Sequence, residues 1–140
     1  MTREKQAKQV LDFASNFAIS QNSDVALLVG DMNSSPNSPV YNMITGEGFS
    51  DALSSIVGAS AVSDVSYATW GATDNTWTGP GGAFNDGYTL RLDYIFYKTI
   101  KSQVSMVGVS DSYKTLELKT TSGLSLSDHS FVESSFELTR

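Results

Sequence analysis

Three short segments of the chain carry side chains that together are suited to act on a phosphate ester. Asp31 and Asn33 follow the apolar run VALLVG, Asp93 lies inside RLDYIF, and Asp128 and His129 lie in LSDHS. A carboxylate can accept a proton from an attacking water, and an amide can donate to a phosphoryl oxygen. An imidazole held by a carboxylate can carry positive charge near the reacting group. These side-chain types are the parts of a metal-assisted phosphodiesterase, without its metal ligands.

Each of these residues also has a simpler interpretation. Asp31 and Asn33 are common turn formers and are compatible with an Asx-turn. If the backbone stays extended there, they point to the same side and enter one site together. His129 is the one histidine of the sequence and is compatible with a structural or surface position. Asp93 lies between apolar residues and is either a solvent-facing acid of an edge strand or a buried carboxylate that needs a partner, for which Arg91 and His129 are the candidates.

Length and composition restrict the class of protein. A chain of 140 residues with 40% hydrophobic and 17% charged residues is typical of one globular domain at most. The formal net charge of -6 argues against a non-specific nucleic-acid binder and is compatible with an acidic cation site. The absence of cysteine excludes disulfides, zinc-thiolate sites and thiol nucleophiles. No apolar run reaches the roughly 18 residues of a membrane span, and MTREKQAKQ lacks an apolar signal-peptide core, so we expect a soluble chain with no transmembrane segment.

The elements that must position the candidate residues begin with a helix. A continuous stripe at helical spacing predicts this helix, and its members are Ala7, Val10, Leu11, Ala14, Phe17 and Ala18. Thr2 is the expected N-cap. The continuous apolar run 25–29 predicts a strand buried on both faces, as in a layered α/β domain. Ser38 and Pro39 predict the N-cap and first residue of a short second helix.

The second part of the chain is expected to hold mostly strands and loops. RLDYIFYK alternates, with Leu92, Tyr94 and Phe96 on one side, and QVSMVGV is a further strand candidate. A final strand is expected from about Phe131, with its core side formed by Val132, Phe136 and Leu138. TWTGPGGAFNDG predicts a short strand piece and a long loop, and the pattern of 54–66 predicts no particular element. The expected fold class is α+β or layered α/β.

Three motifs give the chain a resemblance to a known superfamily. GDMN resembles the G-D-x-N motif of the endonuclease/exonuclease/phosphatase superfamily, RLDYIF resembles its [RI]-x-D-Y-[IV] strand, and LSDHSFV resembles its S-D-H motif. The order of the motifs fits as well. Within the superfamily the chain is most similar to the neutral sphingomyelinases, through the helix before DVALLVGDMN, through GEGFSDA, the TW loop and TSGLSLSDH. The fungal inositol-phosphosphingolipid phospholipases are a second candidate.

The resemblance implies a fold and a reaction. It implies that residues 1–140 are a partial domain, the C-terminal half of a four-layer α/β/β/α sandwich, and that the metal-binding Glu and Asn of the family come from a missing N-terminal half. It implies Mg²⁺-dependent hydrolysis of sphingomyelin, a membrane sphingolipid, to ceramide and phosphocholine, with an intracellular, membrane-associated location for the full-length family. We expect this chain to be inactive by itself.

The resemblance also implies roles for individual residues. Asp31 matches the acid that activates or positions the water, and Asn33 the amide that contacts the phosphate. Asp93 matches the carboxylate that orients the histidine, and His129 matches that catalytic histidine. Asp128 lies beside it in the metal region.

Two alternatives to a sphingomyelinase remain open at this point. The first is a nuclease or an inositol-phosphate or inositol-phosphosphingolipid hydrolase of the same superfamily. The acidic net charge and the uncharged TWTGPGGAF loop count against a nucleic-acid partner, since a nucleic-acid groove should be basic. The second is a partial domain without catalysis that acts as an interaction module.

Overall fold

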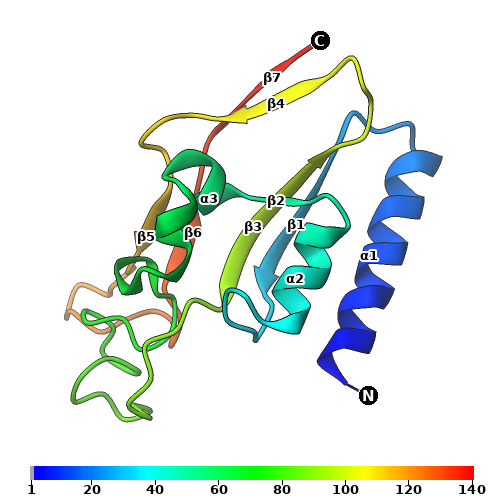
Figure 1. The fold of residues 1–140 in the computed structure, drawn as a ribbon. Helices are drawn as coiled ribbons and strands as arrows, with labels where there is room; N and C mark the ends of the chain where they lie inside the picture. The colour runs from blue at the N-terminus through cyan, green and yellow to red at the C-terminus, as the bar shows by residue number, and fades with distance from the viewer. Residues whose placement is uncertain (1) are drawn as a thin grey trace.

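The computed structural model describes residues 2–140, in which helices alternate with the first two strands and five further strands follow (Figure 1). The helices are α1 (Arg3–Ser20), α2 (Pro39–Gly46) and α3 (Ala52–Ile56), followed by the 3₁₀ segments η1 (Ala59–Ser63) and η2 (Val65–Tyr67). The strands are β1 (Val25–Asp31), β2 (Ser50–Asp51), β3 (Asp93–Thr99), β4 (Ser105–Gly108), β5 (Lys114–Leu116), β6 (Phe131–Glu133) and β7 (Phe136–Thr139). This mixture of few helices and small sheets agrees with the α+β expectation.

The strands form three small antiparallel sheets. The largest has the order β1-β3-β2, and the two-stranded sheets pair β4 with β7 and β5 with β6. In the β1–β3 pair, Val25 lies opposite Thr99 and the register ends with Asp31 opposite Asp93. The pairing therefore brings two acids, which are distant in sequence, to the same end of one sheet.

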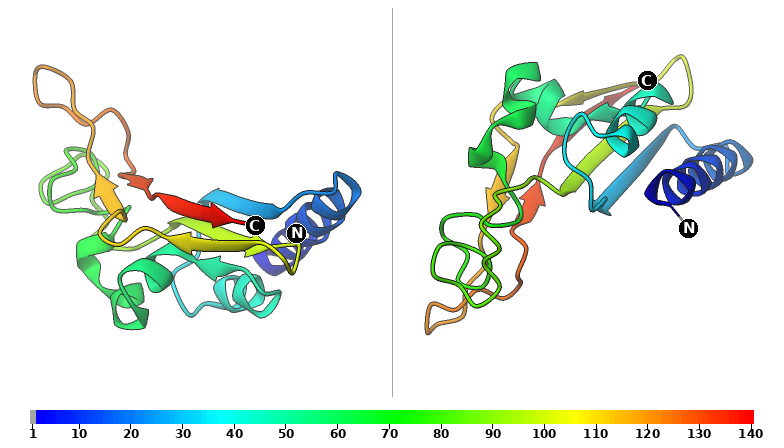
Figure 2. Two further views of the ribbon diagram at one scale, coloured as in Figure 1. Left: turned by 90° about the horizontal axis from the view of Figure 1, so that it is seen from above. Right: turned by 60° about the horizontal axis from the view of Figure 1, so that its bottom comes forward.

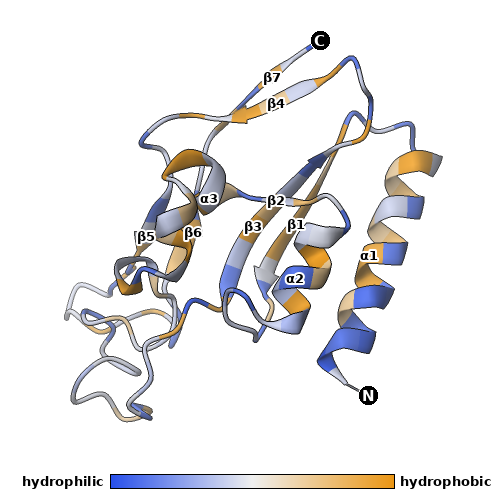
Figure 3. Ribbon diagram, in the orientation of Figure 1, coloured by the Kyte–Doolittle hydropathy of each residue, from blue (hydrophilic) through white to orange (hydrophobic). Residues whose placement is uncertain are grey.

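The main core lies between one face of this sheet and the helices α1 and α2. Tyr94 and Phe96 project from β3 into it and are at most 1% exposed. They meet Ile44 of α2 and Leu11 of α1. Figure 3 shows the hydrophobic residues of α2 and β3 together with the hydrophilic first turn of α1. The predicted alternation of RLDYIFYK is confirmed for Tyr94 and Phe96.

The start of α2 is also as predicted. Ser38 is the N-cap, its Oγ accepts a hydrogen bond from the Tyr41 amide at 3.3 Å, and Pro39 opens the helix. Thr2 is the N-cap of α1, although its side chain makes no capping hydrogen bond.

The strand β1 is not buried on both faces, which corrects the expectation from its apolar run. Ala26 and Leu28 pack against the core, whereas Leu27 and Val29 are 53% and 60% exposed. Successive side chains of a strand point to opposite faces. Helices α1 and α2 cover one face only, and β1 is an edge strand, so among the described residues nothing buries Leu27 and Val29.

The predicted apolar stripe of α1 is likewise too wide. Leu11 and Ala18 are buried, but Val10 is 45% and Phe17 is 53% exposed. The helix touches α2 and the edge strand β1, and Figure 2 shows it at the margin of the fold. Such a position buries only a narrow stripe. None of the helices described between residues 2 and 140 has the length and apolar character of a membrane span.

The C-terminal strands and the central loops differ from expectation in detail. The final strand is divided into β6 and β7, and Leu138 is 48% exposed rather than on the core side. TWTGPGGAFNDG forms turns without a strand, and the segment 54–66 contains the end of α3 and η1. The loop 70–90 and the loop between β5 and β6 lie together at one end of the molecule (Figure 2).

Candidate functional site

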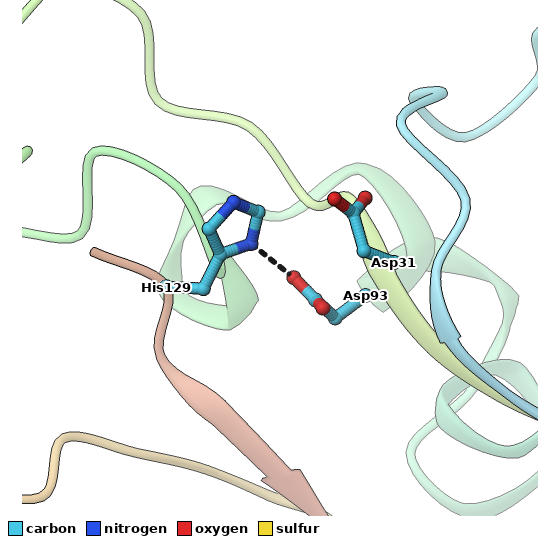
Figure 4. A group of neighbouring side chains, drawn as sticks. All are labelled: Asp31, Asp93 and His129. Atoms are coloured by element: carbon cyan, nitrogen blue, oxygen red, sulfur yellow. Dashed lines mark hydrogen bonds and ion pairs between the residues drawn. The ribbon is translucent and has the colours of Figure 1, made fainter. Parts of the chain in front are cut away.

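Asp31, Asp93 and His129 meet where β1 ends and β3 begins. Each of the three side chains has one nitrogen or oxygen atom able to bind a metal that lies within 4.8 Å of those of the other two. His129 comes from the loop before β6, and its Nδ1 lies 2.7 Å from Oδ2 of Asp93 (Figure 4). Asp31 is exposed, and the other two are half-buried, so the group is open to solvent.

His129, rather than Arg91, is the partner of Asp93. The guanidinium of Arg91 is buried and binds Asp51 instead. Because an ionised carboxylate only accepts hydrogen bonds, Nδ1 of His129 carries the hydrogen and donates it to Asp93. In the neutral ring this leaves Nε2 as a free proton acceptor.

The segment after β1 contains a turn, so the condition of an extended backbone, under which Asp31 and Asn33 would point to the same side, is not met at Asn33. The Asn33 amide donates a hydrogen bond of 2.6 Å to Oδ1 of Asp31, and Asn33 has a φ of 46°. This is the Asx-turn that the residue types allowed. The turn and the site are compatible, since Oδ2 of Asp31 forms no hydrogen bond within residues 2–140.

Asn33 lies beside the group of three rather than within it. Its side chain is exposed, and with Asp31 it borders a pocket of about 300 Å³ between α1 and β1 that Leu28 and Val40 also line. An amide in this position is available to a ligand that enters next to Asp31.

Asp128 is adjacent to His129 in sequence but its carboxylate is not part of the group. Its carboxylate lies 3.4 Å from the Ser127 hydroxyl, and its carbonyl accepts a hydrogen bond of 2.9 Å from the Thr78 hydroxyl. It is exposed and borders a shallow pocket with Trp77 and Phe84. The structure therefore places Asp128 on the neighbouring surface.

The loop TDNTWT holds the histidine segment in place, a function that sequence reasoning missed. Asn75 is 3% exposed, and its Nδ2 donates to the Ser127 carbonyl at 3.0 Å. Its Oδ1 accepts hydrogen bonds from the amides of Trp77 and Thr78. Thr76 and Ser125 exchange two hydrogen bonds between side chain and amide. A buried asparagine can form hydrogen bonds with both of the loops that it joins. The sequence gives no local signal for this contact, because Asn75 and Ser127 are 52 residues apart.

Trp70 limits the movement of the His129 ring. The two rings are 5.1 Å apart at an interplanar angle of 66°, an edge-to-face contact. Nε1 of Trp70 donates to the Asp86 carboxylate at 3.2 Å. Hydrogen bonds from the Tyr88 amide and from Trp70 lower the pKa of Asp86, which keeps it ionised as the acceptor for Trp70.

The group of three fits a divalent cation that prefers oxygen ligands. Mg²⁺ in proteins is bound by one or two carboxylates together with waters and substrate phosphate oxygens. Oδ2 of Asp31 and Oδ1 of Asp93 form no hydrogen bond within residues 2–140, so both remain available. Nδ1 of His129 already binds Asp93, and the oxygen atoms are therefore the natural ligands.

Solved structures with the same fold include two with low sequence identity. An endonuclease/exonuclease/phosphatase family protein from Bacteroides thetaiotaomicron is 19% identical, with a TM-score of 0.55 over 97% of this chain and 45% of its own. A beta toxin from Staphylococcus aureus is 21% identical, with a TM-score of 0.51 over 95% of this chain and 45% of its own. The chain thus spans about half the length of these proteins. No curated protein sequence matches it.

The sequence profile of one family matches most of the chain. The profile is that of the Endonuclease/Exonuclease/phosphatase family, and it matches residues 2–129, which include Asp31, Asp93 and His129. Members of this family are typically hydrolytic phosphoesterases that use a divalent metal. The chain belongs to the endonuclease/exonuclease/phosphatase family.

Proposed function

We propose that the chain is the part of a magnesium-dependent phosphodiesterase that carries its catalytic histidine, and that the enzyme is of neutral sphingomyelinase type. In this proposal the complete enzyme hydrolyses sphingomyelin in a membrane to ceramide and phosphocholine. The observation that carries the proposal is the convergence of Asp31, Asp93 and His129 within 4.8 Å. The motifs around these residues and the family membership support it.

His129 and Asp93 act as a pair in this proposal. Asp93 accepts the Nδ1 hydrogen and fixes the orientation of the ring. The protonated imidazole then places positive charge beside the phosphoryl group as that group gains negative charge. Trp70 restricts the ring through its edge-to-face contact.

Asp31 and Asn33 act on the water and the phosphate. The carboxylate of Asp31 activates or positions the attacking water, and the side-chain amide of Asn33 donates to a phosphoryl oxygen without adding negative charge. Asp31 and Asp93 would hold Mg²⁺, which would supply Lewis-acid stabilisation of the phosphoryl oxygens. We assign Asp128 to the outer part of the metal region, where its exposed carboxylate adds negative potential.

Turnover by the whole protein requires more than the described residues. Two carboxylates alone hold Mg²⁺ loosely, and a loosely held ion does not align the reacting groups. We therefore expect the isolated chain to bind Mg²⁺ weakly and not to hydrolyse sphingomyelin. A segment that supplies further oxygen ligands should restore turnover.

The test combines the chain with the N-terminal part of a related family member. The two pieces are co-expressed and purified together, and phosphocholine release from sphingomyelin micelles is measured with Mg²⁺. Asp31→Ala and His129→Ala should each abolish the release. Asp12→Asn on the exposed side of α1 is the matched control and should leave it unchanged. Unchanged turnover in His129→Ala would disprove the assignment of the histidine.

A substrate panel decides the specificity. Sphingomyelin micelles, inositol phosphates, inositol phosphosphingolipids and DNA are offered to the same complex. Preferential release of phosphocholine supports the proposal, whereas preference for DNA or an inositol phosphate replaces it with another hydrolase of the family. A complex that binds Mg²⁺ but hydrolyses none of these substrates would favour an interaction module without catalysis.

A further inference from the structure

Thr69 is a fully buried hydroxyl residue whose side chain lies beside the first residue of β3. It is 0% exposed, and its Oγ1 accepts hydrogen bonds from the amides of Leu92 at 3.0 Å and Asp93 at 3.1 Å. Asp93 is the residue whose carboxylate binds His129. A single side-chain oxygen therefore fixes the backbone from which the Asp93 carboxylate projects.

The main chain of the same residue holds the histidine segment. The Thr69 carbonyl accepts a hydrogen bond of 2.8 Å from the amide of Ser130, the residue directly after His129. The two halves of the Asp93–His129 pair, 36 residues apart in sequence, are thus connected through one residue. The next residue, Trp70, packs its ring edge-to-face against His129.

The position of Thr69 is itself constrained by β-type pairing. The amides of Thr69 and Trp70 both donate to the Leu90 carbonyl at 2.9 Å, and the Leu90 amide donates to Trp70. Pairing with Leu90 on one side and with Ser130 on the other fixes the backbone of Thr69. A shift of Oγ1 would therefore break buried hydrogen bonds, which costs free energy.

We propose that Thr69 is a positioning residue that sets the carboxylate of Asp93 against Nδ1 of His129. It thereby maintains the ring tautomer with hydrogen on Nδ1 and Nε2 free. The effect of Thr69 on catalysis rests on the proposed function, whereas its effect on the tautomer of His129 does not depend on that function. A displacement of about 1 Å between reacting groups can cost about 10²-fold in rate, so the position of this pair is important for turnover.

The experiment uses the fact that His129 is the one histidine of the sequence, so that ring ¹⁵N spectra report on this residue alone. The chain is labelled with ¹⁵N-histidine, and the two ring nitrogens are observed at a pH at which the same spectra show the neutral ring. Thr69→Val has nearly the shape of threonine but lacks the acceptor. Thr69→Ser retains the acceptor and is the matched control. Circular dichroism verifies the fold of each variant.

We expect the Nδ1–H form to dominate in the wild type and in Thr69→Ser. In Thr69→Val the ratio of Nδ1–H to Nε2–H should fall about tenfold, which corresponds to the net loss of one hydrogen bond. A folded Thr69→Val with the wild-type ratio would overturn the proposal. An equal fall in Thr69→Ser would overturn it too, because packing rather than the acceptor would then set the ring.

Two further variants keep the proposal testable if Thr69→Val does not fold. Thr69→Cys retains the reach of the side chain with a weak acceptor and should give an intermediate ratio. A wild-type ratio there overturns the proposal. Asp93→Ala should abolish the preference for Nδ1–H. If Asp93→Ala keeps the preference for Nδ1–H, the Asp93–His129 pair on which the proposed function depends is refuted. If the tautomer ratio changes in Asp93→Ala but not in Thr69→Val, only the role of Thr69 is refuted.

Discussion

Arg91 and Asp51 form a two-pronged ion pair in the interior of the protein. Nη1 of Arg91 lies 2.9 Å from Oδ2 of Asp51 and Nη2 lies 2.5 Å from Oδ1, with side-chain exposures of 3% and 1%. The guanidinium also lies over the Tyr94 ring at 4.4 Å, and the Tyr41 hydroxyl donates to Asp51. Asp51 is the N-cap of α3, and Arg91 is two residues before Asp93, so this pair anchors the segment that leads into the site.

Loss of one partner of this pair should be strongly destabilising. Asp51→Ala leaves the buried charge of Arg91 without a counter-ion and removes the N-cap of α3, so we expect the free energy of unfolding to fall by about 3–5 kcal/mol. Urea unfolding followed by circular dichroism measures it. Asp12→Ala, which breaks the exposed pair with Lys8, serves as the control and should leave the urea midpoint unchanged. Equal midpoints for the two variants would contradict the structural importance of the buried pair.

Stability should decrease at alkaline pH because of three buried tyrosines. Burial is the main reason that the pKa values of Tyr41, Tyr94 and Tyr113 lie above their ordinary value of 10.0. The folded state holds these protons more tightly than the unfolded state, so their contribution is complete below pH 10.0 and is lost as the pH rises above it.

The expected slope is about 1.4 kcal/mol of unfolding free energy per pH unit for each tyrosine above that value. Urea titrations between about pH 8 and about pH 11 measure it, and tyrosinate absorbance follows the ionisation. Tyr113→Phe should make the decline less steep, while Tyr88→Phe, at a side chain 64% exposed, should not. A decline that is equally steep in Tyr113→Phe would refute this account.

The sequence predicts the residues of the candidate site better than it predicts the residues that hold them in position. GDMN, RLDYIF and LSDH single out Asp31, Asp93 and His129 as candidates because each lies in a short motif, and the structure brings these three side chains together. It also answers which residue partners Asp93, since Arg91 is bound to Asp51. Thr69 and Asn75 could not be found this way, because their hydrogen bonds join segments that are distant in sequence and their residue types are common in loops.

The burial of β1 illustrates a second limit of sequence patterns. A continuous apolar run is typical of a strand that is buried on both faces. The run does not say which elements cover each face. Ala26 and Leu28 face the helices as expected, and Leu27 and Val29 do not. The number and position of neighbouring layers is tertiary information that the run itself does not contain.

Adjacent leucines of β1 should therefore differ in their contribution to stability. Leu28 packs against the core cluster, and Leu28→Ala should cost about 2 kcal/mol because it removes packed methyl groups. Leu27 is 53% exposed, so Leu27→Ala should cost less than about 1 kcal/mol. Paired urea unfolding curves of the two variants provide the comparison. If Leu27→Ala proves as destabilising as Leu28→Ala, the exposed face of β1 is covered in solution.

Asn75 should be a principal support of the His129 segment. Asn75→Ala removes hydrogen bonds to the Ser127 carbonyl, the Glu117 carboxylate and two amides, and we expect a loss of about 3 kcal/mol. Amide hydrogen exchange of His129 should accelerate as well, because its loop loses an anchor. The matched control is Asn16→Ala on the exposed side of α1, which should leave both measurements near the wild type. Unchanged exchange in Asn75→Ala would show that other contacts hold the loop.

Gly79 lies close to two main-chain carbonyl oxygens beside this supporting loop, and its substitution gives the last prediction. A Cβ at Gly79 would lie 2.4 Å from the carbonyl oxygens of Ala72 and Asn75, both of which are main-chain atoms that cannot rotate away. Gly79→Ala should therefore displace the loop and cost at least about 2 kcal/mol. Gly46, at the end of α2, has no atom within 4 Å of the same position, and Gly46→Ala should stabilise the protein by about 0.5–1 kcal/mol through the helix preference of alanine. Urea unfolding of both variants, with the His129 ring spectrum as a second readout, tests the pair. A wild-type spectrum and stability in Gly79→Ala would mean that the loop accommodates the methyl group and does not determine the position of the histidine.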